Sequence, residues 1–104
     1  MIRVSVLYPN SPGATFNMSY YIDSHMQTLV KGKLGAALKD MQIDHGLGGG
    51  MPGVPPPYIA ACHMFFDSVQ AFEAAFGPNA EAILSDIPNY TNVQPTVQVS
   101  EVKM

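Results

Sequence analysis

The stretch Tyr58–Asp67, with the sequence YIAACHMFFD, decides the fold because both of its alternating faces are apolar. In an extended chain, residues 58, 60, 62, 64 and 66 lie on one side and residues 59, 61, 63 and 65 on the other. A strand that is apolar on both sides is typical of the centre of a sheet. We therefore predict a central strand here and arrange the other elements around it.

Three further segments have the two-residue period of strands. Residues 2–8 alternate apolar side chains with more polar ones, which predicts a half-buried strand. Leu38–His45 has the same period, although a helical spacing also fits its first residues. Val93–Val102 predicts the last strand, since Pro95 is tolerable near the start of a strand or at a sheet edge.

The segment Asn17–Val30 predicts an amphipathic helix. Its apolar residues recur at spacings of three and four, which places them on one face. Asn17 suits the N-cap position, because its side-chain oxygen can accept a hydrogen bond from a backbone N–H of the first turn. The pattern ends between Gly32 and Gly35, so we expect the helix to end there.

A second helical region follows the central strand. Asp67 or Ser68 can cap a short helix, and Gly77 followed by proline is typical of its C-terminus. A further helical piece is expected over Asn79–Asp86, before Pro88. The second helix is therefore predicted to be broken in two.

The order β-α-β-β-α-β predicts a ferredoxin-like α+β sandwich, with residues 1–104 forming one domain. Right-handed crossovers give a four-stranded antiparallel sheet with both helices on one face. The other face must be polar or covered by a partner. Because 47% of the residues are hydrophobic and only 12% are charged, we expect a homodimer that stacks sheet on sheet.

Charge and apolar pattern exclude several classes of partner. The net charge is −3, and of the five Lys and Arg residues only Lys31 and Lys33 lie close together, which argues against nucleic-acid binding. No run approaches the ~20 apolar residues of a membrane span, and the N-terminus lacks a signal-peptide pattern. The single cysteine, Cys62, cannot form an internal disulfide, so we expect a cytoplasmic protein.

The first predicted helix carries the best candidate site. His25 lies on its apolar face, and Tyr21 precedes it by four residues, the spacing at which two helical side chains meet. An imidazole titrates near neutral pH and could serve as general acid or base for a small substrate. When buried it needs a hydrogen-bond partner, which Tyr21, a water molecule or Asp86 could provide. A histidine that only stabilises the core is the alternative.

The segment DIPNYTN at residues 86–92 is the second candidate. Its proline prevents the preceding helix from continuing, so one interpretation is a turn built on Asp and Asn side chains. The other is that Asp86, Asn89 and Tyr90 line the rim of a pocket and orient a substrate. If Asp86 reaches His25, its carboxylate would fix the tautomer of the ring and raise its basicity.

Other polar residues favour structural roles. His45 and His63 lie on predicted strands among apolar neighbours, and Cys62 fits a small buried side chain. The three histidines are about twenty residues apart and no Glu-x-x-His pair exists, so we predict no metal site. The sequence gives no specific signal for haem ligation by one of them.

The segment Gly46–Pro57 holds five glycines and four prolines and predicts a loop between two strands. Gly48–Gly53 formally matches G-x-G-x-x-G, but prolines follow it instead of a helix. We therefore predict no dinucleotide cofactor of the Rossmann type. The loop is expected to cover a pocket or to contact a second protomer.

Several motifs together resemble the EthD family, a group of small bacterial proteins named after one encoded beside a cytochrome P450 system that degrades fuel ethers. The motifs are SVLYPN at 5–10, FNMSYY with a following HM at 16–26, GLGGG at 46–50, PGVPPPY at 52–58 and DIPNYTN at 86–92. The resemblance covers the chain from end to end and implies a ferredoxin-like protomer in a dimeric α+β barrel. One departure is Gln27, where family sequences often have proline; it hardly bears on His25.

The resemblance implies a protein that acts on or binds a small apolar organic molecule, without a tightly bound metal or nucleotide. Family members are often labelled reductases or ether-degradation proteins, so an oxidoreductase or an accessory to a partner oxygenase system is one expectation. His25 would then be the acid–base group and Tyr21 its hydrogen-bond partner. The competing interpretations are a non-catalytic dimer that sequesters small molecules, and a dimer whose cavity is filled by its own side chains.

Overall fold

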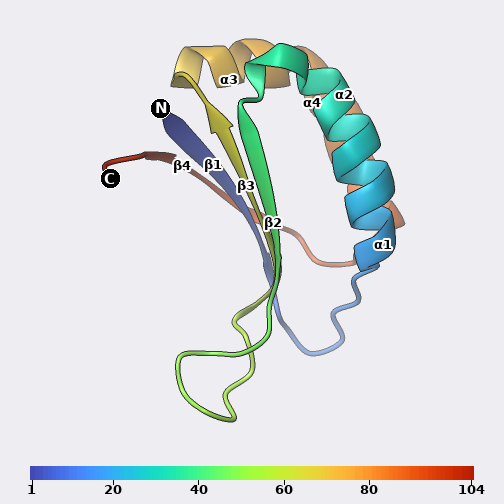
Figure 1. The fold of residues 1–104 in the computed structure, drawn as a ribbon. Helices are drawn as coiled ribbons and strands as arrows, with labels where there is room; N and C mark the ends of the chain where they lie inside the picture. The colour runs from blue at the N-terminus through green and yellow to red at the C-terminus, as the bar shows by residue number, and fades with distance from the viewer.

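The four strands form one antiparallel sheet in a computed structural model that describes residues 1–104 (Figure 1). The strands are β1 Ile2–Pro9, β2 Asp40–His45, β3 Tyr58–Phe66 and β4 Thr96–Glu101. Their order in the sheet is β2-β3-β1-β4, and each neighbouring pair is antiparallel. The predicted sheet is confirmed, with β3 in its interior.

The helices cover one face of this sheet and leave the other face open (Figure 1). The first helical region of this layer begins with α1 Met18–Tyr20, continues as the π-helical segment Tyr21–Val30 and ends with α2 Lys31–Leu34. The second helical region contains α3 Val69–Phe76 and α4 Ala80–Ser85. This arrangement confirms the predicted α+β sandwich.

A side-chain N-cap precedes each of the two helical regions, at the positions that the sequence predicts. The side chain of Asn17 accepts a hydrogen bond from the backbone N–H of Tyr20 at 3.0 Å. The side chain of Ser68 accepts from the backbone N–H of Ala71 at 3.1 Å. Each cap satisfies a backbone donor that has no partner within its helix. None of the helices combines the length and the apolar character needed to cross a lipid bilayer.

The prediction that Gly77 ends a helix is only partly right. Its backbone is right-handed, with φ −49° and ψ −54°, and a 3₁₀ turn over Gly77–Asn79 leads directly from α3 into α4. The following proline is tolerated because the first turn of a helix does not need its missing N–H. α3 therefore ends at this point, but the chain stays helical as it bends into α4.

Two strands begin later than predicted. Gly35 has a φ of 57°, which favours glycine, and it turns the chain into a 3₁₀ turn over Gly35–Ala37. Leu38 then packs against the core, and β2 begins only at Asp40. The last strand begins directly after Pro95, which has no N–H to donate to the sheet.

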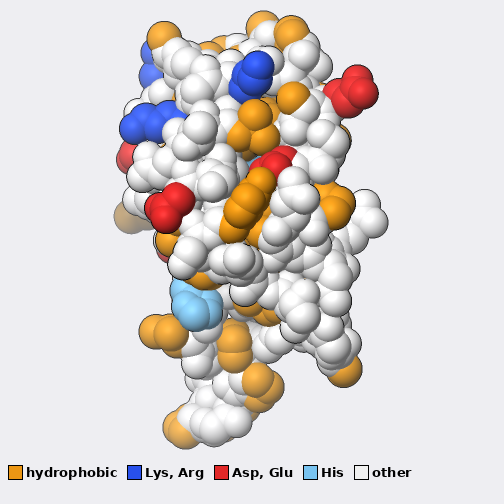
Figure 2. All heavy atoms as spheres, turned by 90° about the vertical axis from the view of Figure 1, so that its right-hand side faces the viewer, with side chains coloured by type: hydrophobic (Ala, Val, Ile, Leu, Met, Phe, Trp, Pro, Cys, Tyr) orange, Lys and Arg blue, Asp and Glu red, His pale blue; other side chains and the backbone are white.

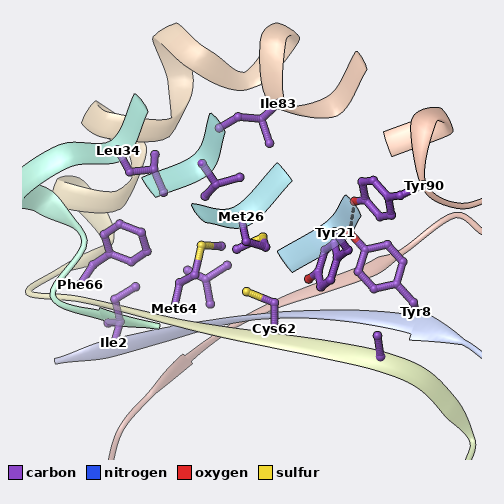
Figure 3. Packing of buried hydrophobic residues seen from close by; sticks show 13 residues of the cluster. Ile2, Tyr8, Tyr21, Met26, Leu34, Cys62, Met64, Phe66, Ile83 and Tyr90 are labelled. Atoms are coloured by element: carbon purple, nitrogen blue, oxygen red, sulfur yellow. Dashed lines mark hydrogen bonds between the residues drawn. The ribbon is translucent and has the colours of Figure 1, made fainter. Parts of the chain in front are cut away.

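The hydrophobic core lies between the sheet and the helices (Figure 3). From the sheet, Val4, Cys62 and Phe66 are at most 1% exposed. From the helices, Met26 and Ile83 are buried against them. Burial of these apolar side chains is the main favourable contribution to the free energy that holds the helices on the sheet.

The open face of the sheet carries a polar cluster among half-buried apolar side chains. The hydroxyl of Ser5 and Nδ1 of His63 are 2.9 Å apart, and Nε2 of His63 lies 3.3 Å from a carboxylate oxygen of Asp44. Ile59 and Phe65 are half-buried on the same face. This face is therefore neither wholly polar nor wholly apolar.

The loop between β2 and β3 projects beyond the end of the sheet (Figure 1). A Cβ atom at Gly46 would lie 2.1 Å from the backbone oxygen of Tyr58, so the close approach at the base of the loop requires glycine. Near its tip, Leu47 and Met51 are 92% and 70% exposed. The loop thus presents large apolar side chains to solvent.

Candidate functional site

A cavity of about 230 Å³ lies between the sheet and the helices. Seventeen residues line it, and 15 of them are hydrophobic. The lining residues are Val4, Val6, Tyr8, Tyr21, His25, Met26, Val30, Leu34, Cys62, Met64, Phe72, Phe76, Ile83, Leu84, Ile87, Pro95 and Val97. A concave apolar site with a few polar groups is typical of small-molecule binding.

A surface groove leads into this cavity between α4 and the segment that precedes β4. Leu84, Ile87, Pro95 and Val97 line both the groove and the cavity. Of these, Leu84 and Val97 are more than half exposed. A molecule of suitable size can therefore reach the cavity from this side.

The π-helical segment places Tyr21 and His25 on the cavity wall. In this winding the backbone N–H of Lys31 bonds to the oxygen of Met26, five residues earlier. The wider turn brings residues four and five apart onto one face. The buried residues of the segment are Tyr21, His25, Met26 and Val30. The sequence pattern predicted a regular helix here, whereas π-helical turns are rare and frequent at functional sites.

His25 contacts Asp86, as the sequence hypothesis required. The distance from Nδ1 of His25 to Oδ2 of Asp86 is 2.9 Å, although the two residues are 61 positions apart. Because an ionised carboxylate can only accept, Nδ1 carries the proton and donates it. Nε2 then presents a lone pair, and no protein group hydrogen-bonds to it.

Asp86 is held in place by three donors. The hydroxyl of Tyr20 donates to Oδ1 at 2.8 Å, the side-chain amide of Asn89 donates to Oδ1 at 2.9 Å, and His25 donates to Oδ2. Burial acts to raise the pKa of the Asp86 carboxyl, but the hydrogen bonds from Asn89, His25 and Tyr20 outweigh it and lower this pKa. Asp86 is therefore a fixed negative charge beside the imidazole at neutral pH.

His25 is neutral at neutral pH. Burial lowers its pKa below the ordinary value of 6.5, and the neighbouring Asp86 opposes this effect only in part. The unfolded chain therefore binds more protons than the folded chain just below pH 6.5. In that window the free energy of unfolding decreases as the pH falls. Above it, His25 is available as a base.

Replacing Asp86 with Asn is expected to lower the pKa of His25 further. The amide keeps the size of the side chain but removes the charge that favours the imidazolium, so burial acts unopposed. An NMR titration of the His25 ring protons measures the effect directly. The wild-type midpoint should lie below 6.5 and the Asp86→Asn midpoint lower still. A midpoint that rises in the variant would contradict this electrostatic assignment.

Tyr21 stacks on His25 instead of hydrogen-bonding to it. The two ring centroids are 5.8 Å apart and the ring planes differ by 16°. The Tyr21 hydroxyl is buried and has no hydrogen-bond partner in the protein. The expectation that Tyr21 is the hydrogen-bond partner of His25 is therefore corrected, because Asp86 occupies that role.

An aromatic cluster surrounds the site, and no sequence motif predicted it. Tyr8 packs edge-on against Phe16 and Tyr21, with centroid distances of 5.1 and 5.5 Å. The hydroxyls of Tyr8 and Tyr90 hydrogen-bond to each other (Figure 3). Burial raises the pKa of Tyr8 to about 12. The only signal in the sequence was the number of aromatic residues near positions 8, 16–21 and 90.

The predicted rim residues lie around His25 and not in the cavity wall. Asp86 and Asn89 are joined by a hydrogen bond, and neither lines the cavity. The ring of Tyr90 packs against His25 with a centroid distance of 4.7 Å. The structure thus brings together all five predicted site residues, but it places three of them behind the histidine. Direct substrate binding by these three stays a prediction.

The remaining candidates lie elsewhere. His45 is exposed at the end of β2, and His63 belongs to the cluster on the open face of the sheet. Cys62 is buried on the cavity wall, where burial raises its pKa to about 12. No three His, Cys, Asp or Glu side chains lie close enough together to hold a metal ion. The loop Gly46–Pro57 contributes no residue to the cavity wall.

Comparison with solved structures gives close matches. An EthD-like protein from Ralstonia eutropha JMP134 is 41% identical, with a TM-score of 0.93 over 99% of this chain and 92% of that one. An ethyl tert-butyl ether D (EthD) family protein from Bacillus halodurans C-125 is 18% identical, with a TM-score of 0.74 over 99% of both chains. The second likeness shows the fold alone. A scan against protein-family models and a search of curated proteins gave no match.

Proposed function

Because the chain belongs to the EthD family, we propose that it binds a small, largely apolar organic molecule in the cavity and acts on it by proton transfer at His25. The observation that carries the proposal is the His25–Asp86 pair beside an apolar wall. Nε2 of His25 has no protein partner, so it is free to meet a ligand. A buried histidine with a carboxylate behind it is a suitable general acid or base.

The contacts of His25 suit it to move a proton in both directions. When Nε2 accepts a proton from the bound molecule, the ring becomes an imidazolium that the Asp86 charge stabilises at 2.9 Å. The apolar wall strengthens this interaction because it keeps the local dielectric low. The same proton can return to another atom of the molecule. This sequence of steps uses only side chains of this chain.

A second candidate function is an oxidoreductase, or an accessory to a partner oxygenase system, in the degradation of such molecules. Proton transfer at His25 changes no oxidation state, so in this case the partner system would supply the oxidant. This candidate rests on the resemblance to the EthD family. The alternative is a dimer that binds and sequesters a small molecule without turning it over. The feature that favours this alternative is the wall itself, since His25 is the only histidine or charged residue among its 17 residues.

A second copy of this chain is the proposed partner of the open sheet face. Leu7, Ile59 and Phe65 lie half-buried on that face, and a sheet-on-sheet homodimer would cover them. Hydrophobic side chains also gather on the projecting loop at the lower end of the molecule (Figure 2). Leu47 and Met51 of this loop are suited to contact a second protomer. A cytoplasmic location stays a prediction from the sequence.

Native mass spectrometry of freshly purified protein tests this function. Two variants of β4 make the test specific to the cavity. Val97 and Val99 lie on the same face of the strand and are 56% and 43% exposed, but only Val97 lines the cavity and its groove. We expect wild type and Val99→Trp to be dimers that carry the extra mass of a small organic molecule. We expect Val97→Trp to be a dimer without that mass, because the indole obstructs the entrance.

Two results would contradict the proposal. A monomeric wild type would exclude the homodimer. A bound mass that survives equally in both tryptophan variants would place the ligand outside the cavity.

A further inference from the structure

We infer that the ligand of this cavity is a neutral, ring-sized molecule with one oxygen acceptor, and that the hydroxyl of Tyr21 donates a hydrogen bond to that oxygen. The inference rests on the proposed function, since it names the ligand class of the same cavity. It assigns Tyr21 a contact with the ligand, in place of the contact with His25 that the sequence suggested.

The unpaired hydroxyl of Tyr21 is the observation that carries the inference. The residue is 0% exposed, it lines the cavity, and its hydroxyl has no protein partner. The hydroxyls of Tyr8 and Tyr90, whose rings pack against Tyr21, already bond to each other. In Figure 3 the Tyr21 hydroxyl points away from this pair and lies on the side of Cys62. A buried donor without a partner is costly, so a ligand acceptor that satisfies it gains affinity.

The hydroxyl acts as a donor in this contact. Burial raises the pKa of Tyr21 above its ordinary value, so the phenol keeps its proton at any ordinary pH. A hydroxyl can donate one hydrogen bond, and no protein acceptor meets the Tyr21 hydroxyl with hydrogen-bond geometry. The thiol of Cys62 beside it is only a weak acceptor, which a ligand oxygen would replace. The complementary group on the ligand is therefore a carbonyl, ether or similar oxygen.

The size of the cavity limits the ligand. An apolar cavity of about 150 Å³ lined by aliphatic and aromatic side chains binds benzene. At about 230 Å³, this cavity is larger but still below the range of drug-sized pockets. It fits one ring with a small substituent. Met26 and Met64 on the wall can adapt to the shape of that substituent.

The charges around the cavity favour a neutral ligand. No Lys, Arg, Asp or Glu lines the wall. The carboxylate of Asp86 lies behind His25 and outside the cavity wall, so a cationic ligand in the cavity would make no direct contact with it. An anionic ligand would face this negative charge across a neutral imidazole. An ion would thus lose its hydration without gaining a counter-charge.

A matched pair of probes tests the inference. Acetophenone and α-methylstyrene have nearly the same shape, but the second has a CH₂ group where the first has the carbonyl oxygen. We expect calorimetric titration of wild type to give roughly tenfold tighter binding for acetophenone, as one hydrogen bond provides. In Tyr21→Phe this preference should disappear while α-methylstyrene binds as in wild type. Benzoate should bind neither protein.

The outcomes separate this inference from the proposed function. Equal binding of both probes to wild type, or a preference that Tyr21→Phe retains, would overturn the donor role while the cavity stands. Tight binding of benzoate would overturn the neutral ligand class. If neither neutral probe binds a folded wild type, the cavity proposal itself fails. The carbonyl ¹³C shift of bound acetophenone should move downfield, and it reports the hydrogen bond in wild type without the variant.

Discussion

Replacing His25 with Gln is expected to reduce catalysed proton exchange by about 100- to 10,000-fold, the usual contribution of a general base. The reporter is acetophenone in D₂O, whose methyl protons are acidic because they lie beside a carbonyl. Nε2 of His25 would remove one proton from this carbon while the Tyr21 hydroxyl supports the enolate oxygen. Return of a deuteron from the exchanged imidazolium regenerates the ketone, so NMR sees the methyl signal disappear.

Glutamine suits this test because it fills a similar volume and can still donate to Asp86. His45→Gln is the matched control, since His45 is exposed at the end of β2 and does not line the cavity. It should exchange the methyl protons at the wild-type rate. Wild-type exchange at the rate of buffer alone, with acetophenone bound, would contradict catalysis and favour the sequestering dimer. Undiminished exchange in His25→Gln would exclude His25 as the base.

Replacing Tyr8 with Ala is expected to destabilise the protein by about 3–5 kcal/mol, the range for removing a large buried aromatic side chain. Tyr8 is 2% exposed and packs edge-on against Phe16, Tyr21 and Tyr90. The variant loses these contacts and leaves the Tyr90 hydroxyl without its partner. Since domains of this size have only about 5–15 kcal/mol of stability, the loss is large.

Tyr8→Phe separates packing from hydrogen bonding. It keeps the ring and removes only the bond to Tyr90, so we expect a loss of about 1–3 kcal/mol. Urea denaturation measures both variants, and the midpoint should fall while the slope of the transition stays unchanged. Equal losses in the two variants would show that the aromatic packing contributes little. The cluster would then not be what holds Tyr21 and Tyr90 against His25.

The sheet and the order of its elements were predictable because the strands are short and strongly periodic. Tyr58–Phe66 is apolar on both faces, and a strand in the interior of the sheet can shield both faces from water. The N-caps at Asn17 and Ser68 were predictable because a cap depends on one local side chain. The prediction that Gly77 ends the helical path is only partly right, since glycine permits a left-handed backbone but does not require it.

Only those features of the site that depend on the spacing of nearby residues could be predicted. His25 and Tyr21 could be placed on one face of a helix, but the π-helical winding depends on packing that no local pattern records. The contact of His25 with Asp86 was a hypothesis, because it joins residues 61 positions apart. A pocket was expected, but the residues that line it could not be predicted. They come from eight helical and strand segments and Pro95, and the cavity exists only because their side chains leave the space between them unfilled.

The methyl groups of the seven methionines offer the most direct test of a ligand cavity beside His25. Met26 and Met64 line the cavity, whereas Met1, Met51 and Met104 are exposed elsewhere. We would label the methionine methyls with ¹³C and titrate the protein with acetophenone. The methyl signals of Met26 and Met64 and the ring signals of His25 should shift together and saturate at one concentration. Shifts confined to the exposed methionines, or no saturable shift at all, would contradict a ligand cavity at this site.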